Sequence, residues 1–167
     1  LSMYRKPWHT SNDMRELNFS DFINCPWNTI IDKPEYFGMK SGDARVGQRL
    51  QYDMHPLSGQ MPSSIIELRN LKLQGHLGML NRDINVAIVR HEEVVESPHL
   101  FLRELSACYH IALQSKEVKI PSGKYGWSWP ERAKKIGKIP NKLAPQDREL
   151  ILKKLNLSQE LSLGYQY

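Results

Sequence analysis

The sequence predicts an α+β fold: a small mixed or antiparallel sheet packed by two or three helices, with extended N- and C-terminal segments. Three observations lead to this prediction. Residues 47–55 alternate apolar and polar side chains, residues 84–95 open with β-branched residues, and residues 97–114 carry an apolar stripe at helical spacing. A chain of 167 residues is long enough to bury one core.

Residues 1–47 are predicted to form an extended arm followed by an irregular segment that lies over the domain. The first part shows no periodicity. Asn12 or Asp13 is expected to cap a short helix that continues to about Asn24. From Cys25 onward, prolines and glycines interrupt any regular element.

Residues 48–121 are predicted to form the α+β core. The alternation in residues 47–55 is typical of a half-buried strand. The leucine-rich stretch 64–80 fits two short strands about as well as one helix. Gly75 and Gly78 favour strands, because a glycine costs about 1 kcal/mol in a helix interior.

A β-α-β module is predicted to complete this core. Residues 84–95 supply a strand, Ser97 and Pro98 mark the start of a helix that continues to 114, and residues 117–121 form a second short strand. The helix is expected to bury one face against a sheet that includes residues 84–90. That face carries Phe101, Leu105, Cys108 and Ala112.

Residues 122–167 are predicted to form a basic aromatic loop and a C-terminal helix. Pro145 marks the start of the helix, which is expected to span Asp147 to about Leu161. Its apolar stripe is expected to consist of Leu150, Ile151, Leu155 and Leu157.

The positive charge is concentrated in one part of the chain. The net charge is +5 at pH 7, but residues 1–102 hold 11 Lys/Arg against 12 Asp/Glu. Residues 103–154 hold 12 Lys/Arg against 5 Asp/Glu, a net charge of +7. This asymmetry indicates an acidic partner, with nucleic acid first and an anionic membrane surface second.

The cysteines and the hydropathy pattern indicate an intracellular protein. Cys25 and Cys108 are far apart and form no C-x-x-C pair, so both are expected to be ordinary thiols in a reducing compartment. The sequence has no apolar run long enough to span a membrane and no secretory signal. A soluble or peripheral protein is expected, with the mitochondrial matrix as the most concrete compartment.

No catalytic or metal-binding motif is recognisable. His91 and Glu92 resemble the start of an H-E-x-x-H zinc motif, but position 95 is a valine. Cys108 and His110 are two residues apart on the predicted helix and point in different directions. No catalytic residue, metal site or cofactor is therefore predicted.

The clearest functional pattern lies in residues 116–142, where eight Lys/Arg and two Glu are interleaved with aromatic residues. Cations neutralise phosphates and aromatic faces stack on unpaired bases, so the pattern predicts an RNA-binding surface. The alternative is that Trp127 and Trp129 anchor an irregular loop to the core beneath solvated lysines. The predicted RNA-binding residues are Lys116, Lys119, Lys124, Tyr125, Trp127, Trp129, Arg132, Lys134, Lys135, Lys138 and Lys142.

These features together predict a non-enzymatic, RNA-contacting structural subunit of a large ribonucleoprotein assembly, most concretely a mitochondrial ribosomal protein that contacts rRNA and neighbouring subunits. Two alternatives stay open. One is a viral matrix-type or other protein-protein module whose basic surface meets a nucleocapsid or an anionic membrane. The other is an enzyme without a recognisable motif.

Overall fold

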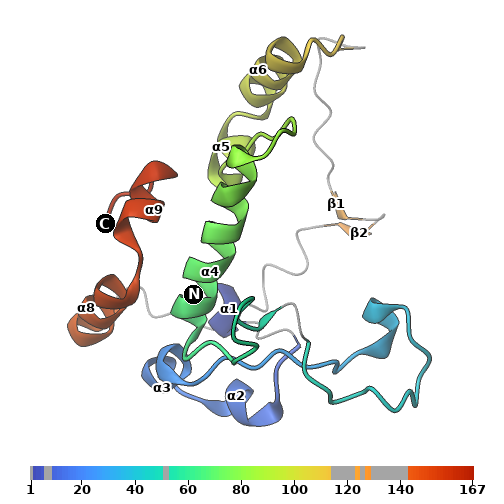
Figure 1. Cartoon of the computed structure of the whole chain (residues 1–167), viewed down its shortest axis with the longest axis vertical. Coiled ribbons are helices and arrows are strands. Elements are labelled where there is room, and N and C mark those ends of the chain that lie inside the picture. The colour runs from blue at the N-terminus through green and yellow to red at the C-terminus, as the bar shows by residue number, and fades with distance from the viewer. Residues whose placement is uncertain (1, 6–8, 51–52, 114–122, 125–126, 129–142) are drawn as a thin grey trace. The chain divides into compact units, whose positions relative to one another are not determined.

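The computed structural model describes residues 2–5, 9–50, 53–113, 123–124, 127–128 and 143–167 (Figure 1). The chain divides into two compact units. The larger unit comprises residues 1–82 and 137–167, and the smaller unit comprises residues 83–136.

Helices dominate the described part of both units (Figure 1). The larger unit contains α1 (Ser2–Arg5), α2 (Asn12–Glu16), α3 (Phe19–Asn24), the 3₁₀ helix η1 (Pro34–Phe37), α4 (Ile65–Gly78), the 3₁₀ helix η3 (Met79–Asn81), α8 (Pro145–Lys154) and α9 (Leu157–Ser162). The smaller unit contains α5 (His91–Glu96), α6 (Pro98–Tyr109) and two short strands, β1 (Gly123–Lys124) and β2 (Trp127–Ser128).

The predicted α+β fold is wrong. Within the described residues the only sheet is the antiparallel pair of two-residue strands β1 and β2. The alternating stretch around residues 47–55 contributes one isolated bridge, Ile30 to Arg49, and the predicted strand at 84–90 has no regular structure. The predicted strand at 117–121 lies outside the described residues.

The stretch predicted as strands around residues 64–80 is the helix α4. Ser64 caps its N-terminus, accepting a hydrogen bond from the Glu67 N–H at 3.2 Å, while Glu67 accepts one from the Ser63 N–H at 2.5 Å. The Ser64 hydroxyl thereby satisfies one N–H group that the first helical turn leaves unpaired, and the Glu67 carboxylate reaches back to the residue before the cap. The two glycines lie where they cost least, since Gly75 is exposed and Gly78 is the last helical residue.

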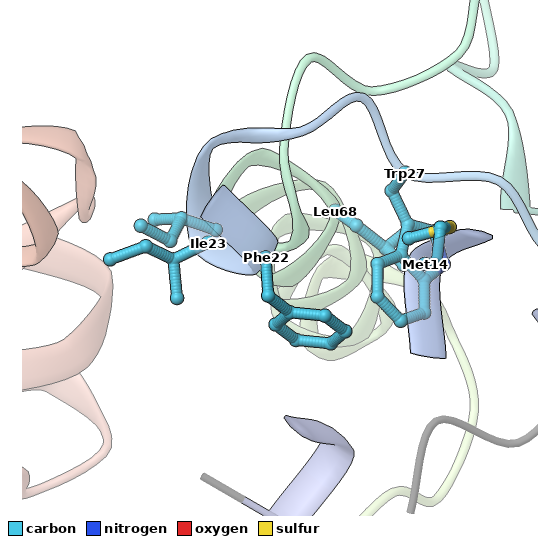
Figure 2. Packing of buried hydrophobic residues seen from close by; sticks show 6 residues of the cluster. Met14, Phe22, Ile23, Trp27 and Leu68 are labelled. Carbon is cyan, nitrogen blue, oxygen red and sulfur yellow. The ribbon is translucent and has the colours of Figure 1, made fainter. Parts of the chain in front are cut away.

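The core of the larger unit joins α2, α3 and α4. Figure 2 shows Phe22 and Ile23 of α3 close to Leu68 of α4, with Met14 and Trp27 beside them. The rings of Phe22 and Trp27 pack edge to face with centroids 5.7 Å apart. Trp27 is also held at its polar end, where the indole N–H donates to the Thr29 hydroxyl at 2.8 Å. Edge-to-face packing adds to the hydrophobic stabilisation of these large side chains.

The segment between α3 and α4 is tied down by isolated hydrogen bonds. Thr10 pairs with Thr29 in an antiparallel bridge, and Ile31 N–H donates to the Gln48 carbonyl at 3.0 Å. Leu50 is buried, and its N–H donates to the Thr29 carbonyl at 2.9 Å. These contacts give this irregular segment a defined path without a sheet.

Two predicted helices are each divided in two by an asparagine cap. The helix expected to start at Asn12 or Asp13 breaks after Glu16, and Asn18 then caps α3 by accepting from the Asp21 N–H at 2.9 Å. The helix expected from Asp147 to Leu161 breaks in the same way at Asn156, which caps α9. Asparagine side chains favour such starts because they accept from the unpaired N–H groups. The predicted apolar stripe is confirmed for Leu150, Ile151 and Leu155, which pack against the core, and it is wrong for Leu157, which is exposed.

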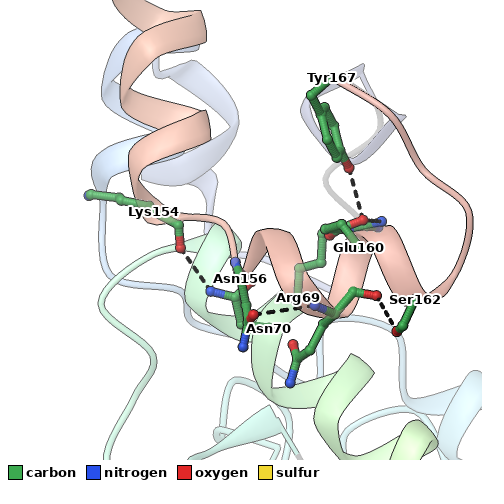
Figure 3. A network of polar contacts seen from close by, with 8 residues as sticks. Arg69, Asn70, Lys154, Asn156, Glu160, Ser162 and Tyr167 are labelled. Carbon is green, nitrogen blue, oxygen red and sulfur yellow. Dashed lines mark hydrogen bonds and ion pairs between the residues drawn. The ribbon is translucent and has the colours of Figure 1, made fainter.

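Asn70 links α4 to the junction between α8 and α9. Its side-chain amide donates to the Lys154 carbonyl at 2.9 Å and accepts from the Asn156 N–H at 3.0 Å (Figure 3). One side chain therefore satisfies backbone groups at the end of α8 and at the cap of α9.

The helix predicted at residues 97–114 is confirmed as α6, but the prediction of its buried face is wrong. Phe101 and Leu105 are only partly buried, whereas Cys108 and Ala112 are exposed. None of the residues of α6 is buried. The predicted sheet that would have covered this face is not present among residues 84–90.

Candidate nucleic-acid interface

Two of the residues predicted to bind RNA fall within the described backbone. Lys124 ends β1 and Trp127 begins β2, and the antiparallel register places these two residues directly opposite each other. Paired residues in such a ladder have Cα atoms about 4.5–5.5 Å apart. The predicted RNA-binding residues outside the described part are Lys116, Lys119, Tyr125, Trp129, Arg132, Lys134, Lys135, Lys138 and Lys142.

A second group of aromatic and charged residues lies in the larger unit, and the sequence patterns do not predict it. We call it the His9 cluster, and it consists of His9, Asp32, Lys33, Tyr36 and Phe37. The backbone brings its parts together, because the Ile30 N–H donates to the His9 carbonyl at 2.7 Å next to the bridge between Thr10 and Thr29. No motif links residues so far apart in the sequence. The one local hint is the consecutive pair Tyr36 and Phe37 in η1.

The centre of the His9 cluster is an imidazole held by a carboxylate. Nδ1 of His9 lies 2.6 Å from Oδ1 of Asp32, and the second carboxylate oxygen accepts a hydrogen bond from Arg15. Burial raises the pKa of Asp32, but the hydrogen bonds from His9 and Arg15 outweigh burial and hold that pKa below the ordinary aspartate value. Asp32 is therefore ionised at neutral pH and fixes the orientation of the histidine ring.

Two aromatic rings flank this imidazole. The centroid of Phe37 lies 4.9 Å from that of His9, and the centroid of Tyr36 lies 5.8 Å away at an interplanar angle of 84°. The Lys33 ammonium lies 5.5 Å from the centre of the Tyr36 ring. Tyr36 nevertheless remains 58% exposed. The arrangement presents an ordered aromatic ring and a cation to solvent.

An apolar groove is a further feature of the larger unit. It has a volume of about 560 Å³ and is lined by side chains of α1, α3, α4 and α8, including Tyr4, Phe19 and Leu73. Arg69 and Lys72 lie at the groove but are ion-paired with Glu160 and Asp53. Because buried carboxylates neutralise these cations, the groove has little charge with which to select an anion.

Metal binding and thiol chemistry find no support in the described part of the chain. No group of three or more His, Cys, Asp or Glu residues there is placed to hold a metal ion. His91 and Glu92 form part of the first turn of α5. Burial raises the pKa of the Cys25 thiol and so disfavours its reactive thiolate form.

Among the described residues, no helix combines the length and the apolar character needed to cross a membrane. No family model, curated protein or solved structure matches the chain.

Proposed function

We propose that this chain is a non-enzymatic, RNA-contacting structural subunit of a large ribonucleoprotein assembly, most concretely a ribosomal protein of the mitochondrial matrix. The observation that carries the proposal is the charge distribution. Residues 116–142 hold eight Lys/Arg against two Glu, together with Tyr125, Trp127 and Trp129. Cations and aromatic rings in one short segment match the two interactions that bind single-stranded or looped RNA.

Two structural features support a subunit role. The described core of the larger unit is small, with six buried side chains in its main cluster. The described part of the smaller unit has large apolar side chains in contact with solvent, a pattern typical of surfaces that neighbouring molecules cover. These side chains are Ile84, Val89, Val95, Leu100, Ile111 and Leu113.

Binding of the purified chain to a structured RNA as a function of salt tests the proposal. Filter binding should give an affinity that falls steeply with salt, because each phosphate contact releases condensed counterions. Trp127→Ala should lower the affinity by roughly 1–3 kcal/mol if the indole stacks on a base, with little change in the salt dependence. Trp127→Phe is the matched control, since it retains an aromatic face.

The result that would overturn the RNA-binding role is equally definite. If RNA affinity is unchanged by Trp127→Ala and by loss of the segment's lysines, while Trp127→Ala unfolds the chain, the tryptophan is a core anchor. The basic residues would then be a solvated surface.

The exposed apolar side chains of the smaller unit also favour a second candidate, a protein-protein structural module. Its basic segment would meet a nucleocapsid or an anionic membrane. Self-association in light scattering without RNA, together with binding to vesicles of phosphatidylserine, would favour this candidate over the first.

A further inference from the structure

We infer that the turn at residues 55–60 is a pH-sensitive switch, which the neutral ring of His55 holds closed and which opens when that ring takes up a proton at Nδ1. The switch lies in the larger unit, between the irregular segment and α4. It does not depend on the proposed function, so RNA binding and the switch can be tested separately.

Backbone hydrogen bonds define this turn. The His55 N–H donates to the Gln60 carbonyl at 2.8 Å, and the Gly59 N–H donates to the His55 carbonyl at 2.9 Å. Gly59 has a φ of +66°, a left-handed conformation that glycine adopts without steric cost. The turn therefore starts at His55 and closes on the backbone of the same residue.

The side chain of His55 adds two further hydrogen bonds within the turn. Its Nδ1 accepts from the N–H groups of Leu57 and Ser58, each at 3.3 Å. Nδ1 is bonded to Cγ, as the side-chain oxygen of an asparagine is, so His55 takes the part of an asparagine that accepts from an N–H two residues on. Because a backbone N–H can only donate, Nδ1 must be unprotonated and the neutral ring carries its proton on Nε2.

Protonation of the ring removes this acceptor. Asparagine has no charged form near neutral pH, whereas histidine is the side chain whose charge ordinarily changes between about pH 5 and pH 8. Once Nδ1 carries a proton it is a donor, and it then faces the two N–H groups of Leu57 and Ser58 with no lone pair to offer. Both side-chain hydrogen bonds of the turn are lost.

A carboxylate favours the protonated ring. Among the described residues, the charged group that faces His55 is Glu67, in the first turn of α4. Hydrogen bonding from Ser63 is the main reason that the pKa of Glu67 lies below the ordinary glutamate value, and the charges of His55 and Lys154 lower it further. His55 therefore has a different partner in each state: two N–H groups when it is neutral, and the Glu67 carboxylate when it is charged. Such a pair of alternatives is what a proton-driven switch requires.

An NMR titration of the full chain between about pH 7.5 and about pH 5 tests the inference. At the higher pH, the ring nitrogen shifts of His55 should report the Nε2–H tautomer. As the pH falls, the hydrogen-exchange protection of the Leu57 and Ser58 amides, corrected for the intrinsic effect of pH, should fall about tenfold. The indole N–H signal of Trp27 should stay unchanged, because this buried side chain belongs to the core.

Three substitutions separate the effect of the proton from the loss of the ring. His55→Asn keeps an acceptor on Cγ but cannot gain a charge, so protection of the two amides should stay high at both pH values. His55→Ala removes the acceptor, so protection should be low at both. Glu67→Gln keeps a hydrogen-bond acceptor for Ser63 but removes the charge, so the turn should open at a lower pH than in the wild type.

Three results would overturn the inference. An Nδ1–H tautomer of His55 at about pH 7.5 would exclude the acceptor role, and this measurement needs no variant. Equal protection of Leu57 and Ser58 at both pH values in the wild type would show that protonation does not open the turn. A loss of protection with falling pH that is as large in His55→Asn as in the wild type would assign the titration to another group.

Discussion

At the scale of single residues, Glu160 is the most constrained charged group among the described residues. Its side chain is fully buried and makes two hydrogen bonds with Arg69, at 2.6 and 2.8 Å (Figure 3). The Tyr167 hydroxyl donates a third at 2.8 Å. The hydrogen bonds from Arg69 hold the pKa of Glu160 below its ordinary value, although burial opposes them. A carboxylate held in this way stabilises the fold only while it is ionised.

Glu160→Gln should therefore destabilise the larger unit at neutral pH. We expect the free energy of unfolding to fall by about 3 kcal/mol. This value is at the low end of the range for breaking a buried ion pair, because the side chain of Arg69 is 43% exposed. Since the pKa is lower in the folded state, the stabilisation is present above the unfolded glutamate value of about 4.3 and is lost as the pH falls below it.

Urea unfolding of both proteins between pH 7 and pH 3 is the measurement. The difference in unfolding free energy between wild type and Glu160→Gln should shrink as the pH falls. A difference that is the same at every pH would show that the ionised pair contributes nothing.

The aromatic core can be tested by removing a single ring. Phe22→Ala should lower the unfolding free energy by about 3–5 kcal/mol, because Phe22 is only 2% exposed and contacts both Tyr4 and Trp27. Leu57→Ala is the control, since Leu57 is 92% exposed and its loss should be neutral. Equal effects of the two substitutions in thermal unfolding would contradict the assigned core.

At the scale of elements, α4 explains why the predicted fold class is wrong. Ser64 followed three residues later by Glu67 is the sequence pattern of a capping box, which marks the start of a helix. The strand prediction instead depends on the cost of two glycines in a helix interior. In the structure both glycines lie in the C-terminal part of α4, whereas the buried Ile66 and Leu68 secure the helix at its N-terminal end.

A glycine substitution tests this account of α4. Gly75→Ala should stabilise the larger unit by about 0.5–1 kcal/mol, because alanine favours helix and nothing lies within 4 Å of the added Cβ. Gly42→Ala is the matched control and should destabilise, because Gly42 has a φ of +84°. Destabilisation by Gly75→Ala in urea unfolding would show that this stretch is not an exposed helix.

The amphipathic pattern of residues 97–114 correctly predicts that α6 is a helix, but it wrongly predicts that one face of this helix is buried. Periodicity reports which residues share a face, but it does not report what covers that face. Leu105→Ala should accordingly cost only about 1 kcal/mol in the isolated chain, since Leu105 is partly buried. A loss as large as that of Phe22→Ala would show that this face is packed in solution.

At the scale of the whole molecule, local patterns predict the positions of α6 and α8 and the stripe of α8. They do not predict the His9 cluster, because the contact between His9 and Asp32 spans 23 positions and depends on the path of the intervening chain. The division into two units has the same origin, since residues 137–167 join residues 1–82. Contacts between segments far apart in the chain leave no periodic pattern in the sequence from which they could be predicted.

The central claim concerns the basic segment, and the most direct test compares two variants that lose the same charge. One changes Lys134, Lys135 and Lys138 to Gln within that segment. The other changes three exposed cations elsewhere, Arg82, Arg148 and Lys153, to Gln. Both variants lower the net charge by three. A weaker long-range electrostatic attraction between the protein and RNA would therefore affect the two variants equally.

The measurement is the slope of log affinity against log salt for single-stranded RNA in filter binding. Each lost phosphate contact lowers the slope by about 0.7, so the Lys134, Lys135 and Lys138 variant should show a slope about 2 smaller than the wild type. The control variant should keep the wild-type slope. Equal slopes for the two variants, or no RNA binding by the wild type, would contradict the account.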